Sequence, residues 1–247
     1  MPRNGGLAAA ACVFAAGLLV AGCDESGGAK NEAVDAVLAD EAIEPTVSAM
    51  KGAFGPDYQA LVKKIGDEAA AGADKAKLVA SASTELKRLT AKYAPLIVQA
   101  PHNDINAYRD MVFQLMQQVQ SIKPELCGAP AVGKVISAEL PPPGMQYSFD
   151  NLAAAVWRAA AAGRDHPVGR KIEPLSAADK DMLAKQMRAN YAGEEEIKPF
   201  LDGPEAILKA PPAQQCKVVV RVYQALGKFS AEDSDRFVAT FVAMAPS

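Results

Sequence analysis

The feature of this 247-residue sequence that most constrains its fold is the spacing of its apolar residues, which recur three and four positions apart in short segments. The clearest such segment runs from Ile105 to Ile122 and stops before Pro124. This spacing places apolar side chains on one face of a helix. Alanine is frequent and aromatic residues make up only 6% of the chain, which favours close helix packing over a β-sandwich. The sequence therefore predicts an all-α fold, an irregular multi-helix bundle.

The predicted helices are short because proline and glycine interrupt the apolar pattern throughout the chain. We expect about eight to ten of them, from the number of separate periodic segments. Ser176 with Asp179 and Ser230 with Asp233 resemble capping boxes at two helix starts. Gly163 is expected to end a helix. Other expected caps are Asn103 or Asp104, and Ser148 or Asp150.

Residues 123–147 differ in composition from the segments on either side, because prolines and glycines punctuate them. We predict a connector there between two helical halves, residues 33–122 and 148–247. Its run of three prolines, 141–143, favours an extended, polyproline-like backbone. Such a segment either binds an aromatic-lined partner or acts as a rigid spacer, and we favour the spacer.

The N-terminal segment has the features of an export signal. Arg3 provides a positive start, and the run from Leu7 to Gly22 is uncharged and apolar. This run is shorter than the ~20 apolar residues that a membrane-spanning helix needs, and it ends in small residues. The segment therefore predicts a cleaved signal peptide.

The end of this segment, Val20-Ala21-Gly22-Cys23, resembles the lipobox of bacterial lipoproteins. The resemblance implies that the thiol of Cys23 receives a diacylglyceryl group. It also implies that residues 1–22 are removed as a signal peptide and that Cys23 becomes an acylated N-terminus. Cys12 is the competing acceptor, but the apolar run that precedes it is too short. The alternatives to a lipoprotein are an ordinary signal peptide and an uncleaved anchor.

A lipid-anchored chain of this kind is expected in the bacterial cell envelope, facing the periplasm. Two or three acyl chains on Cys23 would hold it in the membrane permanently. Asp24 resembles the signal that retains enteric-type lipoproteins in the inner membrane, which favours the inner over the outer membrane. Residues 23–32 are polar and rich in glycine, so we predict a flexible tether before a helical domain of residues 33–247.

Four cysteines are present, and the resemblance accounts for two of them. Removal of Cys12 and acylation of Cys23 leave Cys127 and Cys216 as a pair in an oxidising compartment. We predict that they form a disulfide, whose loop of about 90 residues is worth roughly 4–5 kcal/mol on the chain-entropy model. The alternative is two separate buried thiols.

The sequence carries no recognisable catalytic constellation. It contains only two histidines, and it has no HExxH, CxxC, calcium-loop, Gly-x-Ser-x-Gly or nucleotide-binding glycine motif. His102 with Asp104 provides fewer ligands than a zinc site needs. We therefore predict no catalytic residue, no metal and no cofactor. The formal net charge of −3 and the envelope location argue against nucleic acid as a partner.

One segment concentrates positive charge beside the only tryptophan, Trp157. Its members are Arg158, Arg164, His166, Arg170 and Lys171. As a hypothesis, these residues contact an anion, either a phospholipid head group or an acidic partner. The alternative, which we favour, is a solvated loop, because exposed charges contribute little to binding or stability.

These features together predict a non-catalytic envelope lipoprotein that is anchored in the membrane through its N-terminal acyl chains. It is expected to act through contacts with another envelope protein or with the membrane surface. A lipid or small-molecule binding protein with an apolar cavity among its helices is the first alternative. An envelope hydrolase is the second. It would require His102 or His166 to lie beside a buried acid or a nucleophile.

Overall fold

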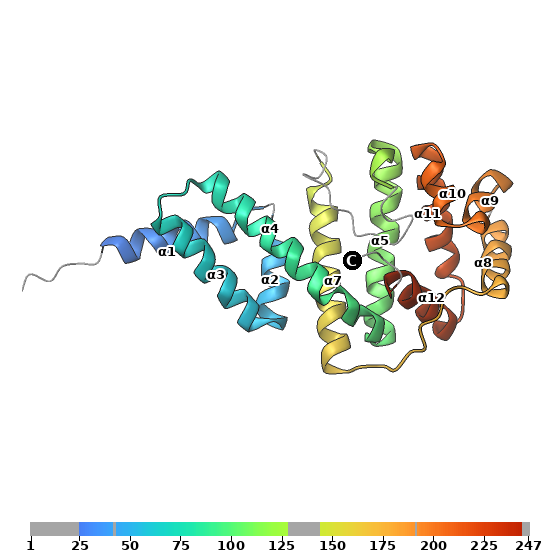
Figure 1. Ribbon diagram of the computed structural model, residues 1–247, viewed down its shortest axis with the longest axis horizontal. Helices are drawn as coiled ribbons and strands as arrows, with labels where there is room; N and C mark the ends of the chain where they lie inside the picture. The colour runs from blue at the N-terminus through green and yellow to red at the C-terminus, as the bar shows by residue number, and fades with distance from the viewer. Residues whose placement is uncertain (1–24, 42, 128–143, 191, 244–247) are drawn as a thin grey trace, which may run out of the picture.

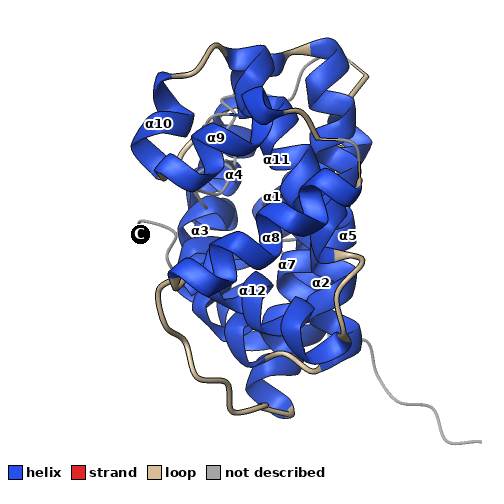
Figure 2. Ribbon diagram, turned by 90° about the vertical axis from the view of Figure 1, so that its right-hand side faces the viewer, coloured by secondary structure: helices blue, strands red, loops and turns tan. Residues whose placement is uncertain are grey.

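The computed structural model describes residues 25–41, 43–127, 144–190 and 192–243 of the chain. Within these ranges the regular structure consists of eleven α-helices and two 3₁₀ helices, without a strand, which confirms the all-α prediction (Figure 2). The elements are α1 (Glu25–Leu38), α2 (Glu44–Ala53), α3 (Gly55–Ala70), α4 (Lys75–Tyr93), η1 (Ala94–Gln99), α5 (His102–Ile122), η2 (Pro124–Cys127), α7 (Gln146–Asp165), α8 (Ala177–Ala189), α9 (Glu194–Asp202), α10 (Pro204–Lys209), α11 (Pro212–Leu226) and α12 (Ala231–Ala243).

The molecule is elongated, with two parts that follow one another along its long axis (Figure 1). We call α1 to α4 the arm, and η1 with all later elements the body. The arm joins the body where α2 packs against α7 and where α4 leads into η1, which packs against α7 and α12. In the body, α5 packs against α7 and α11.

Helices from both sides of the predicted connector, residues 123–147, pack together in the body. The physical reason is that α5, which precedes the connector, buries its apolar face against helices that follow the connector. Contact between apolar faces decides which helices pack together, and proline-rich composition marks only where the chain leaves a helix.

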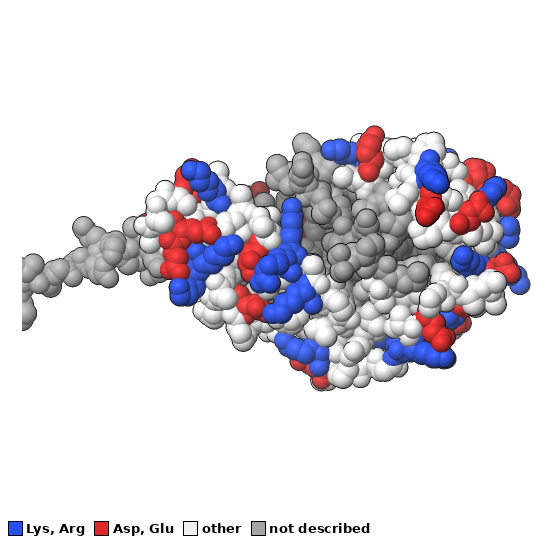
Figure 3. All heavy atoms as spheres, viewed as in Figure 1, with Lys and Arg blue, Asp and Glu red and all other residues white. Residues whose placement is uncertain are grey.

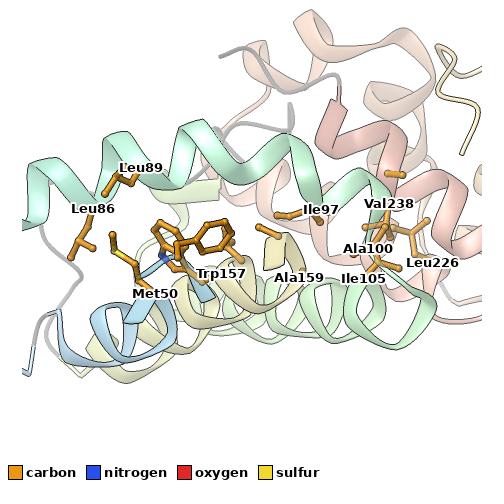
Figure 4. Close-up of a cluster of buried hydrophobic side chains, with 14 of the residues drawn as sticks. Met50, Leu86, Leu89, Ile97, Ala100, Ile105, Trp157, Ala159, Leu226 and Val238 are labelled. Atoms are coloured by element: carbon orange, nitrogen blue, oxygen red, sulfur yellow. The ribbon is translucent and has the colours of Figure 1, made fainter. Parts of the chain in front are cut away.

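The main core runs through both parts of the molecule (Figure 4). At the joint, Trp157 of α7 is fully buried between Phe54, which precedes α3, and Tyr93 at the end of α4. The ring centroids of Trp157 lie 5.1 Å from Phe54 and 5.7 Å from Tyr93. These edge-on and tilted contacts are favoured geometries for aromatic pairs, so the three rings hold arm and body together.

A second, smaller core surrounds the disulfide between Cys127 and Cys216, whose Cα atoms are 5.0 Å apart. The predicted pairing is thus confirmed. The bridge ties η2 to α11, and both cysteines are fully buried. Met145, which precedes α7, is buried in the same cluster. This cluster fastens both ends of the segment 128–143, which lies outside the described residues together with the three prolines 141–143.

Gly163 does not end its helix as predicted, because α7 continues to Asp165. A Cβ atom at Gly163 would overlap the carbonyl oxygen of Leu96 and lie 3.1 Å from the nitrogen of Ala100. The glycine therefore serves close packing of α7 on η1, a role that overrides its usual preference for helix ends.

Of the four predicted helix N-terminal caps, two are confirmed and two are wrong. The Ser176 side chain caps α8 in a full capping box, and Ser230 accepts a hydrogen bond from the backbone of Asp233 at the start of α12. In contrast, α5 already begins after Pro101 and α7 after Met145, without a side-chain cap. The fixed φ of proline suits a helix start, and the buried Met145 side chain anchors the other, so neither start depends on a polar cap.

The predicted tether of residues 23–32 differs from the structure, in which α1 already begins at Glu25. Its later turns pack on the arm through the buried side chains Val34 and Val37, and the helix extends back from them despite two glycines. Cys23 and the signal segment lie outside the described residues. No helix among those described has the length and apolar character needed to cross a membrane.

Candidate functional site

The predicted basic segment is not a continuous surface, because its most buried member turns inward. Arg170 is only 10% exposed and donates hydrogen bonds to the backbone oxygens of Val98, at 3.0 Å, and Ala100, at 2.6 Å. It also pairs with Asp235 of α12 at 2.9 Å. All three partners belong to this chain, so the guanidinium of Arg170 serves the fold.

Arg164 is used at the joint between arm and body. It donates to the backbone oxygen of Ala53 at 2.6 Å and lies 4.6 Å from the ring centroid of Phe54. Its neighbour Asp165 accepts a hydrogen bond from it at 2.6 Å, and this bond raises the pKa of Arg164 and lowers that of Asp165. Arg164 therefore contacts the arm, whereas the partners of Arg170 lie in the body.

The other three residues of the predicted segment, Arg158, His166 and Lys171, are exposed and share no partner among the described residues. Lys171 pairs with Glu173 at 2.8 Å. Arg158 is exposed on α7, and His166 is the exposed residue that follows the end of that helix. The five predicted residues thus do not converge on one anion, and the solvated-loop alternative describes the exposed ones better.

The structure instead assembles a polar seam where α5, the segment after α7 and α12 meet. Its members are His102, Arg109, Arg170, Ser234 and Asp235. The carboxylate of Asp235, 8% exposed, is shared between Nδ1 of His102 at 2.9 Å and Arg170 at 2.9 Å. Beside them, Arg109 donates to the hydroxyl of Ser234 at 2.8 Å. Side chains from three segments thus satisfy one another in a largely buried location.

Asp235, Ser234 and Arg109 were missed by sequence reasoning. A signal was present, because Asp235 lies three residues before Val238 and seven before Val242, on a helical face that is otherwise apolar. A charged residue on a buried face needs a partner. The sequence did not indicate which one, since Arg170 is 65 positions away.

One group of the seam could take part in a reaction. It is the imidazole of His102, whose side chain is 47% exposed. Its Nδ1 is held by the buried carboxylate of Asp235, an arrangement that fixes the orientation of a histidine ring. The other ring nitrogen lies 2.9 Å from the amide nitrogen of Asn106. Among the described residues, the hydrogen-bond partners of this ring are only these two side chains.

A second ionic link ties α12 to α8. Arg236 donates to Asp179 at 2.8 Å, and this hydrogen bond lowers the pKa of Asp179 from 3.8 to about 2. Tyr108 of α5 lies between the two cores, and burial raises the pKa of its hydroxyl to about 12. These groups stay in one charge state over the neutral range, as structural groups do.

In the described part of the chain, no three His, Cys, Asp or Glu side chains come together as a metal site. Comparisons with models of protein families, with curated proteins and with solved structures return no match.

Proposed function

We propose that this protein is a lipid-anchored lipoprotein of the bacterial envelope that presents its helical body to another envelope protein and catalyses no reaction. The observation that carries the proposal is the position of the lipobox cysteine. Cys23 precedes the start of α1 by two residues, and α1 lies at the end of the long axis opposite the body (Figure 1). An anchor at that end leaves the body free to meet a partner in the periplasm.

The structural roles of Arg164 and Arg170, two residues of the predicted basic segment, support a non-catalytic role. Arg170 and Arg164 both hold parts of the fold together through backbone oxygens of η1 and α2. Arg164 and Arg170 therefore hold helices of the fold in place. A rigid fold of this kind suits a protein that offers a fixed surface to a partner.

Acylation is tested by comparing Cys23→Ala with Cys12→Ala, the competing acceptor. We expect the full-length chain to incorporate labelled palmitate and to partition into detergent, and Cys23→Ala to lose both properties. Cys12→Ala should behave as the unmodified chain does. Label that persists in Cys23→Ala would contradict the anchor. Asp24→Ser should move the protein toward the outer-membrane fraction if Asp24 retains it in the inner membrane.

The partner is tested by crosslinking in intact cells, extraction in detergent and identification of what co-purifies. A discrete envelope protein that is lost in Cys23→Ala supports the proposal. A lipid or metabolite without a protein would favour the small-molecule carrier instead.

One observation favours a second candidate, an envelope hydrolase. His102 lies beside the buried acid Asp235, which meets one of the two conditions set for such an enzyme. The same carboxylate is already neutralised by Arg170, however, and a nucleophile is not among the partners of the ring in the described residues. Hydrolysis of ester or amide substrates that is abolished by His102→Ala but not by His166→Ala would establish this activity in place of the first proposal.

A further inference from the structure

Three of the four helices of the arm form a unit of their own. α1, α3 and α4 pack against one another, whereas α2 packs mainly against α7 of the body. We call α1, α3 and α4 the head. Its main contacts with the rest of the molecule are those of α3 with α2 and of α4 with α7 and η1, and they are less extensive than the contact of α2 with α7. The head is therefore joined to the rest of the molecule through a small area.

Side-chain pairs tie the helices of the head to one another. Lys92 of α4 lies 3.3 Å from Asp57 of α3. Lys64 of α3 lies 4.0 Å from Glu85 of α4. Figure 3 shows basic and acidic side chains intermixed over this part of the molecule. The hydroxyl of Tyr93, at the end of α4, also donates a hydrogen bond to Asp57, so the Tyr93 ring is fixed to the head.

Two junctions between the head and the rest of the molecule share one sequence pattern, an aromatic residue, a small residue and a proline. Phe54-Gly55-Pro56 joins α2 to α3, and Tyr93-Ala94-Pro95 joins α4 to η1. Because proline has no backbone N–H, each junction lacks a hydrogen bond that a continuous helix would have. The second junction also changes from α-helix to 3₁₀ helix, a change that often marks a hinge.

The aromatic rings of both junctions meet on Trp157 of α7. The ring centroids of Phe54 and Tyr93 are 4.1 Å apart, and each also contacts Trp157. Phe54 is held on the side of the body, because the guanidinium of Arg164 lies 4.6 Å from its ring centroid. The indole N–H of Trp157 has no hydrogen-bond partner among the described residues. The contact is therefore apolar and non-directional, so the Tyr93 ring can turn against the other two without breaking a hydrogen bond to the indole.

We propose that the head pivots on Trp157 at these two junctions, while α2 stays on the body. Hinge movements are absorbed by a few residues at the ends of helices, as both junctions are. A pivot keeps the three rings buried, so it avoids the cost of exposing them to water. The turn from α1 to α2 is the third connection and follows the movement.

The pivot itself does not depend on the anchor. On the proposed anchor at Cys23, however, the head is the part of the described chain next to the membrane. The pivot then lets the body change its angle to the membrane and so reach a partner.

The test measures distances between paired spin labels in the full-length chain in detergent, with Cys12→Ala and Cys23→Ala so that only introduced cysteines react. One pair, Lys63→Cys with Lys171→Cys, joins head and body. The control pair, Lys171→Cys with Lys209→Cys, lies within the body. The native side chains at these three positions are 77%, 81% and 81% exposed. We expect the head–body distance distribution to be about twofold wider than the control distribution, or more.

A proline substitution locates the hinge. Pro95→Ala restores a backbone donor and lets α4 continue through the junction, so it should narrow the head–body distribution by about half. Pro174→Ala, in an exposed loop of the body, is the matched control and should leave the distribution unchanged. The fluorescence of Trp157 should stay at short wavelength in every variant, because the pivot keeps its ring buried.

Three results would overturn the inference. The first is a head–body distribution as narrow as the control distribution. The second is a head–body distribution that Pro95→Ala and Pro174→Ala change equally. The third is emission from the unmodified chain near that of free tryptophan, because the joint would then open to water and not pivot.

Discussion

The arm and the body are both helical, yet they are stabilised in different ways. The ion pairs of the arm lie at the surface, as in the pair of Lys63 and Asp67, whose side chains are 77% and 52% exposed. The body has exposed pairs too, such as Lys171 with Glu173, but it also has a buried pair, Arg170 with Asp235, and a buried disulfide. Exposed pairs contribute little and are individually dispensable, whereas a buried charge depends on its partner. The stability of the body therefore rests on few residues, and that of the arm is spread over many.

The largest expected effect is loss of the disulfide. Replacing Cys127 and Cys216 together by serine opens a bridge between residues 89 positions apart, which on the chain-entropy model costs about 4–5 kcal/mol of unfolding free energy. The urea-unfolding midpoint measures the loss, with chemically reduced protein as a second route to the same result. A loss below about 1 kcal/mol would mean that the small core holds η2 and α11 together without the bridge.

Removal of Arg170 should be almost as damaging. Arg170→Ala leaves the carboxylate of Asp235 buried without its cation, at a cost of about 3–5 kcal/mol. Lys171→Ala is the matched control, because Lys171 is 81% exposed and pairs only with Glu173, so a change within about 0.5 kcal/mol is expected. Equal urea midpoints for the two variants would contradict the prediction that the buried seam stabilises the body.

Close packing at Gly163 ranks third. Gly163→Ala forces α7 away from the carbonyl oxygen of Leu96, and such overpacking costs about 1–3 kcal/mol. The matched control is Gly169→Ala, where a Cβ atom meets nothing within 4 Å. Thermal unfolding of both variants checks the difference, which should vanish if α7 can shift without loss.

A pH-dependent contribution comes from Asp179. Its pKa is lowered in the folded state to about 2 from 3.8, so it stabilises the fold above pH 3.8 and loses that effect as the pH falls toward about 2. Asp179→Asn should cost about 1 kcal/mol at neutral pH, after allowance for solvent screening, and nothing near pH 2. Asp181→Asn on the exposed side of α8 is the control. A pH-independent difference would assign the loss to the capping box instead.

The smallest effect is expected in the arm. Lys92→Ala removes a pair with Asp57 in which the lysine side chain is 49% exposed, so a loss of about 0–1 kcal/mol is expected. High salt should produce the same change in the unmodified chain. A loss as large as that of Arg170→Ala would erase the distinction between arm and body.

Whether a structural feature of this protein could be predicted from its sequence depends on how far apart the interacting residues lie along the chain. The Ser176 cap was predictable because its partner Asp179 is three residues away, and the apolar face of α5 because its spacing repeats within the helix itself. The disulfide followed from the lipobox resemblance, which left two cysteines to pair. Gly163 and Arg170 were misread because their roles depend on η1 and α12, segments far away in the sequence. The site was therefore predicted less well than the helices.

Trp157 gives the protein a built-in optical reporter. It is the only tryptophan of the chain, and it lies fully buried at the joint, with its indole nitrogen lacking a hydrogen-bond partner among the described residues. Emission from such an indole is shifted to short wavelength and returns toward that of free tryptophan once water reaches the ring. Binding of a partner that separates arm from body would change the fluorescence of the unlabelled protein, whereas an event confined to the disulfide-bonded end of the body would leave it unchanged.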